Sequence, residues 1–329
     1  MYQMHPELLR VENLTIAFRA DNALLPAVHQ IQFSIREQET LAIVGESGCG
    51  KSITSFSIMN LLPPAIAKVT GSVFYRGKQI NTLQENEMSN IRGKDISMIF
   101  QEPMTSLNPV QTIGKQIGEV LKNHTKLKST ERKAKTIEVL KKVGIPRAEK
   151  IIHEYPHQLS GGMRQRVMIA MAIACQPDLL IADEPTTALD VTIQAQILYL
   201  MNELKQQMGT SILLITHDLG VVAEMADRVL VMYYGQIVEE AAVEAIFAEP
   251  KHPYTQGLLN SKPSLETKRQ RLEPIVGSVP IVGGVKIGCP FRQRCQKAFD
   301  KCQTENPPLI NTGNQLVRCW LYTDEEVTI

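Results

Sequence analysis

The chain has 329 residues, of which 43% are hydrophobic and 21% are charged. This composition is typical of a globular protein, and the length allows more than one domain. The formal net charge of +1 argues against a strongly basic surface for nucleic acid, so we expect no nucleic-acid partner. No apolar run reaches the roughly 20 residues of a membrane-spanning helix, and no signal-peptide pattern is present. Any work at a membrane should therefore depend on partner proteins.

Short runs of alternating apolar and polar residues fill residues 8–36 and predict antiparallel strands. Phe18 ends one of these runs. An aromatic ring can stack on a purine base, but a Phe that only packs within its strand explains the pattern equally well. Phe18 is therefore a candidate for contact with a nucleotide base, and both interpretations stay open.

Residues 41–52 form a phosphate-binding loop with its flanking elements. The apolar run from Leu41 to Val44 predicts a buried parallel strand, and a helix should begin at Lys51. Between them the pattern G-x-x-x-x-G-K-S lets backbone N–H groups and the helix N-terminus contact phosphate oxygens. Lys51 should contact the β- and γ-phosphates, and the Ser52 hydroxyl should bind Mg²⁺. The residues predicted to bind the nucleotide here are Gly45, Glu46, Ser47, Gly48, Cys49, Gly50, Lys51 and Ser52.

Strands and helices alternate through the middle of the chain. Residues 110–176 have a helical pattern, and two buried strands follow, at Leu179 to Ala182 and Ile212 to Thr216. This alternation predicts a parallel sheet covered by helices, with ligands at the carboxyl ends of its strands. Asp183 and Glu184 follow one strand directly: Asp183 can hold Mg²⁺ through its water shell, and Glu184 can polarise an attacking water.

Residues 159–166 are Leu-Ser-Gly-Gly-Met-Arg-Gln-Arg, and helical spacing follows from Met163 to Gln176. Ser160, Gly161 and Gly162 should therefore lie at a helix N-terminus, which is a second anion site. Leu-Ser-Gly-Gly resembles the signature of the ABC transporter ATPase family. The resemblance implies that Ser160, Gly161, Gly162 and Met163 act on ATP held by the phosphate loop of a second subunit, so that dimer closure is the power stroke. Many family members have Gln where this chain has Met163.

Other stretches resemble the remaining motifs of that family, over about residues 8–260. Gln101 is similar to the Q-loop glutamine, and Asp183 and Glu184 are similar to the Walker B aspartate and the catalytic glutamate. Ala188-Leu189-Asp190 resembles the D-loop at the dimer interface, and His217 resembles the switch histidine that contacts the γ-phosphate. The resemblance implies the catalytic residues Glu184, His217, Lys51 and Gln101, and the Mg²⁺ ligands Ser52, Gln101 and Asp183.

Two stretches and the long C-terminal extension resemble one branch of that family. Residues 100–109, Phe-Gln-Glu-Pro-Met-Thr-Ser-Leu-Asn-Pro, and residues 252–255, His-Pro-Tyr-Thr, resemble the D-type ATP-binding subunits of oligopeptide and dipeptide importers. This implies an ATPase that powers uptake of di- or oligopeptides and lies on the cytoplasmic face of the cell membrane. The implied partners are a second homologous ATPase subunit or a second copy of this chain, two permeases and an external binding protein.

Two alternative functions stay open. Nickel, metal-chelate and glutathione importers belong to the same branch, and the ATPase sequence hardly excludes them. A soluble ABC ATPase that acts on nucleic acid or ribosomes is less expected. Such proteins usually have two cores in one chain, coiled-coil inserts or basic faces, whereas this chain has one core, no heptad run and a net charge of +1.

Four of the six cysteines, Cys289, Cys295, Cys302 and Cys319, lie in the last 41 residues. Their spacing does not match the short C-x₂-C pairs of common zinc sites or ferredoxins. Four thiolates could hold a [4Fe–4S] cluster, bind one Zn²⁺, or stay free. The sequence around Cys289 and Cys295 resembles peptide-importer ATPases, some of which carry an iron–sulfur cluster. The cluster is therefore the favoured expectation and zinc the alternative.

The expected fold is α/β, a phosphate-loop NTPase core built on a parallel sheet. An N-terminal antiparallel β subdomain, an α-helical signature subdomain and a small Cys-rich extension complete it. Prolines and glycines after residue 240 indicate a linker. The predicted boundaries are 1–240 for the ATPase domain with its helical subdomain at about 102–176, 241–285 for a linker with one short helix, and 286–329 for the four-Cys module.

Overall fold

The computed structural model describes residues 5–20, 23–101, 106–187, 189–261, 275–285 and 287–323. The chain divides into two compact units, each assembled from several chain segments. Unit 1 consists of Met1–Leu8, Ile35–Thr40 and Thr82–Leu214. Unit 2 consists of Leu9–Ser34, Leu41–Asn81 and Ile215–Ile329.

Unit 1 contains short buried strands, including one predicted from the apolar run at Leu179 to Ala182. β6 (Ile96–Ile99) and β7 (Leu179–Asp183) pair in parallel, with Ile96 opposite Leu179. Every residue of both strands is buried, as expected for parallel strands covered on both faces. β8 (Ser211–Thr216), which begins in this unit, follows β7 in the strand order and is also buried throughout. Asp183 is therefore the last residue of a strand that solvent does not reach.

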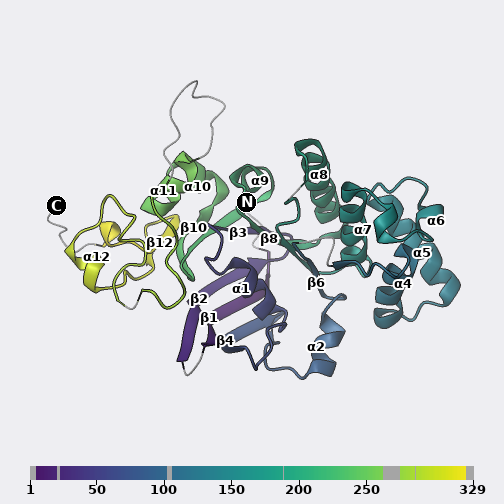
Figure 1. Ribbon diagram of the computed structural model, residues 1–329, viewed down its shortest axis with the longest axis horizontal. Coiled ribbons are helices and arrows are strands. Elements are labelled where there is room, and N and C mark those ends of the chain that lie inside the picture. Colours follow the sequence, from purple (N-terminus) through teal and green to yellow (C-terminus); the bar gives the residue numbers. More distant parts are fainter. Residues whose placement is uncertain are drawn as a thin grey trace. The chain divides into compact units, whose positions relative to one another are not determined.

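Several helices of unit 1 form a group that includes the signature helix. Contacts join α4, α5 and α7 to one another and α6 to α5 (Figure 1). On α5 the buried residues are Thr136, Val139 and Leu140, whereas the charged residues are exposed or half-buried, so the helix is amphipathic. The helical elements of the unit are α2 (Glu85–Ile91), α4 (Ile113–His124), α5 (Ser129–Lys142), α6 (Ala148–Ile151), η1 (Pro156–Gln158), α7 (Gly161–Ile173) and α8 (Val191–Met208).

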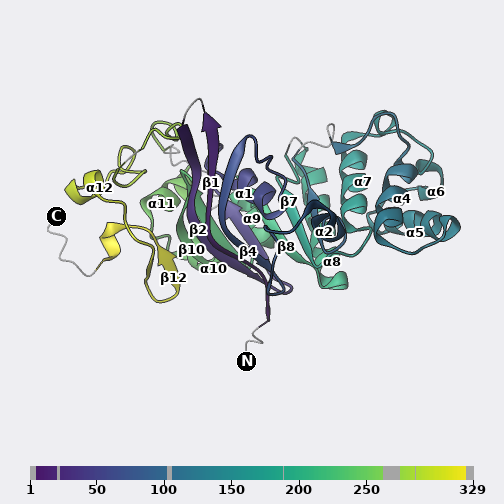
Figure 2. The ribbon, with the colours of Figure 1, turned by 90° about the horizontal axis from the view of Figure 1, so that it is seen from below.

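Unit 2 contains the predicted antiparallel sheet, whose strand order is β2-β1-β4-β5. β1 and β4 pair antiparallel, from Leu9 opposite Tyr75 to Phe18 opposite Ala67, with an irregularity between Glu12 and Thr15. Figure 2 shows the long strands β1, β2 and β4 lying side by side. The bounds are β1 (Glu7–Ala20), β2 (Ala23–Arg36), β4 (Ala67–Tyr75) and β5 (Lys78–Gln79).

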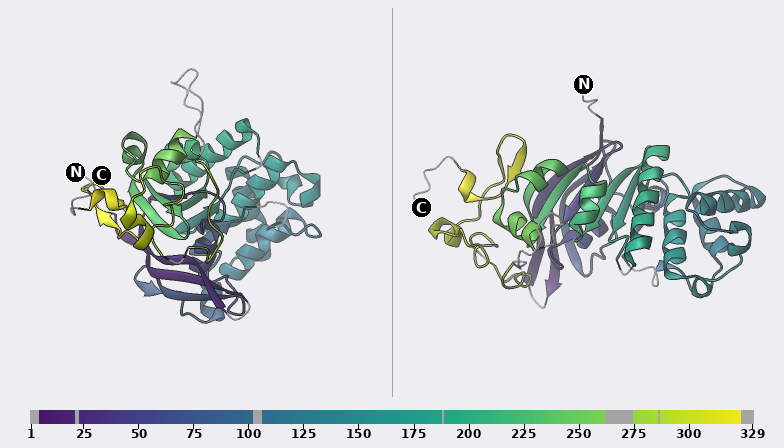
Figure 3. Two further views of the ribbon diagram at one scale, coloured as in Figure 1. Left: turned by 60° about the vertical axis from the view of Figure 1, so that its left-hand side comes forward. Right: turned by 90° about the horizontal axis from the view of Figure 1, so that it is seen from above.

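A second set of strands in unit 2 connects the nucleotide core to the C-terminal segment. β3 (Thr40–Val44) pairs in parallel with β9 (Arg228–Tyr233), and β9 pairs antiparallel with β10 (Gln236–Ala242). β12 (Gln315–Val317) then adds to β10, and β11 (Ile310–Asn311) adds to β12. The C-terminal segment, yellow in Figure 3, thus continues the strand pairing of the core.

Unit 2 also contains a helix that the sequence did not predict. α10 (Val243–Ala248) lies in the stretch expected to be a linker, ahead of the expected short helix, α11 (Pro253–Asn260). The other helical elements are α1 (Lys51–Ile58), α9 (Leu219–Met225), α12 (Asp300–Thr304) and η2 (Trp320–Tyr322). Within the described ranges, no helix combines the length and the apolar character needed to cross a membrane. The domain boundaries stay predictions.

Candidate nucleotide site and four-cysteine module

The phosphate loop connects β3 to α1, and two of its glycines are required by the backbone. Gly45 has φ +154°, and a Cβ on it would lie 2.2 Å from the backbone oxygen of Met232 in β9. Gly50 has φ +107° and is the N-cap of α1, which begins at Lys51 as predicted. Because Gly50 has no side chain, none competes for the N–H groups of the first turn of α1. The loop is therefore shaped to present its backbone, which is what phosphate binding needs.

Lys51 is held by the loop that it follows. Its Nζ donates to the backbone oxygens of Gly45 at 2.7 Å and Glu46 at 3.0 Å, and its side chain is buried. Cys49 is fully buried, with its Sγ 3.8 Å from this Nζ. Burial raises the pKa of the Cys49 thiol, and the charge of Lys51 opposes that rise. Ser52, the predicted Mg²⁺ ligand, is the second residue of α1 and is half-buried.

His217 and Phe18, the other candidates in unit 2, lie on separate elements. His217 is exposed and follows the end of β8 directly. The next residue, Asp218, caps α9 by accepting a hydrogen bond from Gly220 N at 2.9 Å, which anchors the chain on that side of His217. Phe18 is half-buried in β1. Their contacts with a nucleotide stay predictions.

In unit 1, Gln101 and Glu184 are brought together although they are 83 residues apart in the chain. Glu184 Oε2 accepts hydrogen bonds from Gln101 Nε2 at 3.1 Å and from Thr187 Oγ1 at 2.8 Å. The backbone of Glu184 has φ +48°, a left-handed conformation that costs a non-glycine residue energy. Asp183, beside it, is almost completely buried. Thr187 was not among the predicted site residues, although its place three residues after Glu184 could have indicated it.

The signature residues lie at a helix N-terminus, as predicted, but the helix begins at Gly161 rather than at Met163. Ser160 is the N-cap, and its Oγ accepts from Met163 N at 3.4 Å. A Cβ on Gly162 would lie 3.1 Å from Ile193 in α8, whereas a Cβ on Gly161 would meet nothing within 4 Å. Packing within this chain therefore accounts for a glycine at residue 162 but not at residue 161.

Asp190 has a structural partner within its own chain. It is the N-cap of α8, and its Oδ1 accepts from Ile193 N at 2.9 Å. Ala188 of the same predicted motif lies outside the described residues, as do residues 102–105 of the motif that follows Gln101. The role of Asp190 at a dimer interface stays a prediction.

The four C-terminal cysteines, separated by up to 30 residues in the sequence, line one cavity of about 20 Å³. Aromatic and aliphatic residues, among them Trp320, complete its wall together with His252, Arg292 and Lys297. Burial, reinforced by the neighbouring thiols, raises the pKa of Cys289 to about 11 and that of Cys319 to about 12. Across the part of the chain that the structure describes, no group of three or more His, Cys, Asp or Glu side chains is arranged to hold a metal ion. The structure thus gathers the four thiols without placing them as a ligand set.

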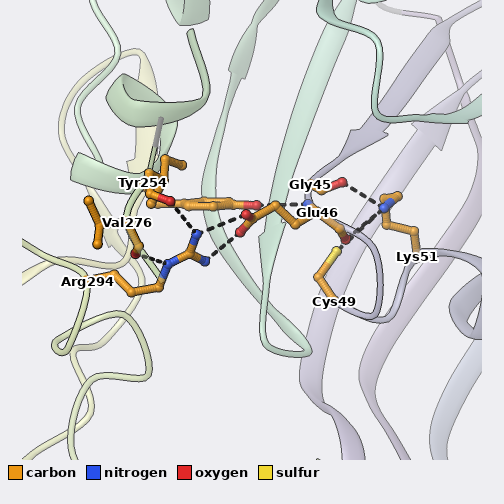
Figure 4. Close-up of polar contacts among 8 residues, drawn as sticks. Gly45, Glu46, Cys49, Lys51, Tyr254, Val276 and Arg294 are labelled. Carbon is orange, nitrogen blue, oxygen red and sulfur yellow. Dashed lines mark hydrogen bonds and ion pairs between the residues drawn. The ribbon is translucent and has the colours of Figure 1, made fainter. Parts of the chain in front are cut away.

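The phosphate loop has two further contacts that the sequence did not predict. Arg294 makes a two-point ion pair with the Glu46 carboxylate, and the Tyr254 hydroxyl accepts a hydrogen bond from Glu46 N (Figure 4). Both residues lie in stretches that supported the resemblance, but they are 208 and 248 positions from Glu46, so no local pattern pairs them.

Comparisons with known proteins agree with these motifs. A family model described as ABC transporter matches residues 28–187, and one described as oligopeptide/dipeptide transporter, C-terminal region, matches residues 238–302. The chain is 55% identical to the oligopeptide transport ATP-binding protein AppD of Bacillus subtilis, over 97% of this chain and 98% of AppD. It is 50% identical to the dipeptide transport ATP-binding protein DppD of the same organism, over 96% of this chain and 95% of DppD.

A solved structure shares the fold of the core. It is the dimeric post-hydrolysis state of the ATP-binding cassette MJ0796 bound to ADP and Pi, with a TM-score of 0.65 and 28% identity, over 72% of this chain and 99% of that chain. The expected fold class is confirmed by this likeness. From the family models and the identities, the chain belongs to the ABC transporter family and, within it, to the oligopeptide/dipeptide transporter ATP-binding proteins.

Proposed function

We propose that this chain binds and hydrolyses ATP to power the uptake of di- and oligopeptides by an ABC importer. The observation that supports it most is the arrangement at the end of β7. There Glu184 is held by Gln101 and Thr187, and Asp183 is buried beside it. A carboxylate oriented by two donors at a strand end is suited to position a water for attack on a γ-phosphate.

The other candidates divide the remaining tasks. Ser52, Gln101 and Asp183 are the residues that would hold Mg²⁺, which would neutralise charge on the phosphates. Lys51 adds positive charge from the loop, and His217 contacts the γ-phosphate. The packing of this chain does not require a glycine at residue 161. A glycine there leaves room for the ATP of a second subunit to approach the backbone closely. Ser160, Gly162, Met163 and Asp190 belong to the same interface with that subunit.

The family resemblance implies the partners, and the cargo is supported by the relatives. Two of them are named for oligopeptide and dipeptide transport, and their alignments with this chain are nearly complete. The chain works as one of two ATPase subunits, together with two permeases and an external binding protein, on the cytoplasmic side of the membrane. A nickel, metal-chelate or glutathione importer of the same branch is the second candidate, because substrate choice lies with the permeases and the binding protein.

Uptake of labelled short peptides tests the proposal, with nickel uptake measured beside it. Cells would carry the wild type, Glu184→Gln, or Glu138→Gln as a matched control, since Glu138 is an exposed acid on α5. We expect Glu184→Gln to lower purified ATPase activity by about 100-fold or more while ATP still binds, and peptide uptake to collapse. Loss of nickel uptake alone would instead support the second candidate, a nickel or metal-chelate importer. Unchanged uptake of both, with ATPase activity lost, would overturn the importer function.

We also propose that Cys289, Cys295, Cys302 and Cys319 hold a [4Fe–4S] cluster. Four soft sulfur donors line one cavity and are the donor set that such a group needs, and a cluster with four cysteine ligands serves structure or regulation rather than substrate chemistry. Zinc is the alternative, and it needs less room than a cluster in a cavity of about 20 Å³. Anaerobic purification decides between them. Iron, sulfide and brown absorbance support the cluster, and zinc without iron supports the alternative. A protein that contains neither iron nor zinc refutes both proposals.

A further inference from the structure

The phosphate loop contains an acidic side chain, although its ligand is strongly anionic. Glu46 is the second residue of the loop, and its carboxylate pairs with Arg294 through Nη1–Oε2 at 2.6 Å and Nη2–Oε1 at 2.9 Å. The Arg294 side chain is 5% exposed and that of Glu46 is 31% exposed. Because the pair is shielded from water on the arginine side, its charges interact more strongly than a surface pair would.

Arg294 is fixed from several sides, so its position is not set by Glu46 alone. Its Nε donates to the backbone oxygen of Val276 at 3.0 Å, and its guanidinium carbon lies 5.8 Å from the ring centre of Tyr233. The hydrogen bonds to Glu46 raise the pKa of Arg294 above its already high normal value. The guanidinium is therefore a permanent positive charge placed by the C-terminal segment, one residue before Cys295.

Tyr254 fixes the backbone of the same loop residue. Its hydroxyl accepts from Glu46 N at 2.9 Å, and its ring is fully buried, 4.7 Å from Tyr233 and 5.4 Å from Phe291. Burial raises the pKa of Tyr254, so the hydroxyl stays neutral. The Glu46 backbone oxygen also accepts from Lys51 Nζ at 3.0 Å. Backbone and side chain of Glu46 are thus both held, and the same residue contacts the lysine that the phosphates require.

We propose that Arg294 is a positioning residue of the nucleotide site, which holds and neutralises the Glu46 carboxylate so that the phosphate loop accepts a triphosphate. The C-terminal module then has a part in ATP binding as well as in its own structure. This inference rests on the nucleotide site, but not on the peptide cargo and not on a metal at the four cysteines. An unpaired carboxylate in the loop would repel the phosphates, and the repulsion would grow with the charge of the ligand.

ATP and ADP dissociation constants of the purified full chain test the proposal. We expect Arg294→Gln to weaken ATP binding roughly three- to tenfold, with a smaller loss for ADP and a smaller loss at high salt. Glu46→Gln leaves the buried guanidinium without its counter-charge, so ATP should bind about two- to threefold more tightly. The double variant should return to within about twofold of the wild type, because both charges are gone. Lys297→Gln removes an exposed positive charge three residues from Arg294 and should change neither constant.

A purely structural role for Arg294 predicts a different pattern. It predicts equal losses for ATP and ADP, no dependence on salt and no rescue by Glu46→Gln; that pattern, or unchanged ATP binding in Arg294→Gln, overturns the proposal. Melting temperatures identify variants that do not fold. If Arg294→Gln is among them, Arg294→Lys keeps one charge without the two-point geometry and should show a loss for ATP about half as large in free energy. Because these measurements use ATP binding alone, a wrong cargo assignment would leave them unaffected.

Discussion

The phosphate loop is built from eight consecutive residues, Gly45 to Ser52, whereas the four-cysteine module takes its side chains from residues 289, 295, 302 and 319. In the loop, glycine conformations and backbone N–H groups make the site, and Cys49 points into the protein. In the module, one cavity collects four side chains, and their thiols are what a metal would contact. Both regions belong to unit 2, and they meet at the pair formed by Glu46 and Arg294.

The difference shows which changes each region tolerates. A site made of backbone depends on the conformations that its residues can adopt, so it loses function when a Cβ is added. A site made of side chains depends on donor atoms, so it loses function when a single atom is exchanged. Substitutions in the two regions should therefore show their effects in different measurements.

The largest expected effect is that of Gly45→Ala in the phosphate loop. The added Cβ would lie 2.2 Å from Met232 O, at a φ of +154° that L-residues rarely adopt, so the loop must move. We expect ATP affinity to fall by about 100-fold or more, as measured by titration of the purified chain. Gly77→Ala is the matched control, because that position has φ +76° with nothing within 4 Å of a Cβ. Normal ATP binding in Gly45→Ala would show that the loop shape is not required.

The next effect is expected from Cys302→Ser in the module. The exchange keeps the shape but replaces a buried sulfur by a hydroxyl, which is a poor ligand for iron or zinc. Metal content should fall, and the melting temperature should drop by about 5–10 °C, as measured by elemental analysis and thermal unfolding. Cys175→Ser, a half-buried thiol outside the module, is the control. Equal metal content in wild type and Cys302→Ser would remove this residue from the ligand set.

A smaller effect concerns His252, which is the N-cap of α11 and lines the cavity of the four cysteines. Its Nδ1 accepts from Tyr254 N, its backbone N–H donates to Glu239, and Arg318 lies nearby. Burial lowers the pKa of His252 to about 3 from an ordinary value of 6.5. Its neutral form is therefore favoured in the fold, and stability is lost as the pH falls from 6.5 toward 3. At pH 5 the loss should be about 2 kcal/mol.

Thermal unfolding at pH 7 and pH 5 measures this contribution. His252→Asn retains a side chain that can cap α11 but does not titrate, so its stability should fall less between the two pH values. Glu239 is a second buried group, and burial raises its pKa, so its contribution changes in the opposite direction. An identical pH dependence in wild type and His252→Asn would exclude His252 as its source.

The smallest effect is expected from Cys49→Ala. The side chain is buried and its backbone, not its sulfur, faces the phosphate site, so ATP affinity should fall only about two- to threefold through a small packing loss. The same burial, with the raised pKa, should make Cys49 slow to react with thiol reagents. Titration of the purified variant with ATP checks the affinity, and mass spectrometry of the wild type after treatment with a thiol reagent, with and without ATP, checks the reactivity. Rapid modification of Cys49 would mean that the loop opens in solution.

Much of the fold and of the nucleotide site could be predicted because their signals are local. The start of α1 at Lys51, the helix N-terminus at Ser160 and the buried strand before Asp183 each depend on residues within a few positions of one another. α10 was missed because its six residues lie in a stretch whose prolines indicated a linker. The pairing of β12 with β10 was missed because a strand of three residues has almost no pattern of its own.

The sequence by itself determined the phosphate loop, the signature and the chemistry available at the strand ends, since glycine positions and short apolar runs restrict the nearby backbone. Only the tertiary structure decided which distant side chains meet. It brought Gln101 within hydrogen-bond distance of Glu184 and gathered the four cysteines around one cavity. It also formed the ion pair between Arg294 and Glu46, which are 248 residues apart. The path of the whole chain sets such contacts, and no spacing within a motif specifies that path.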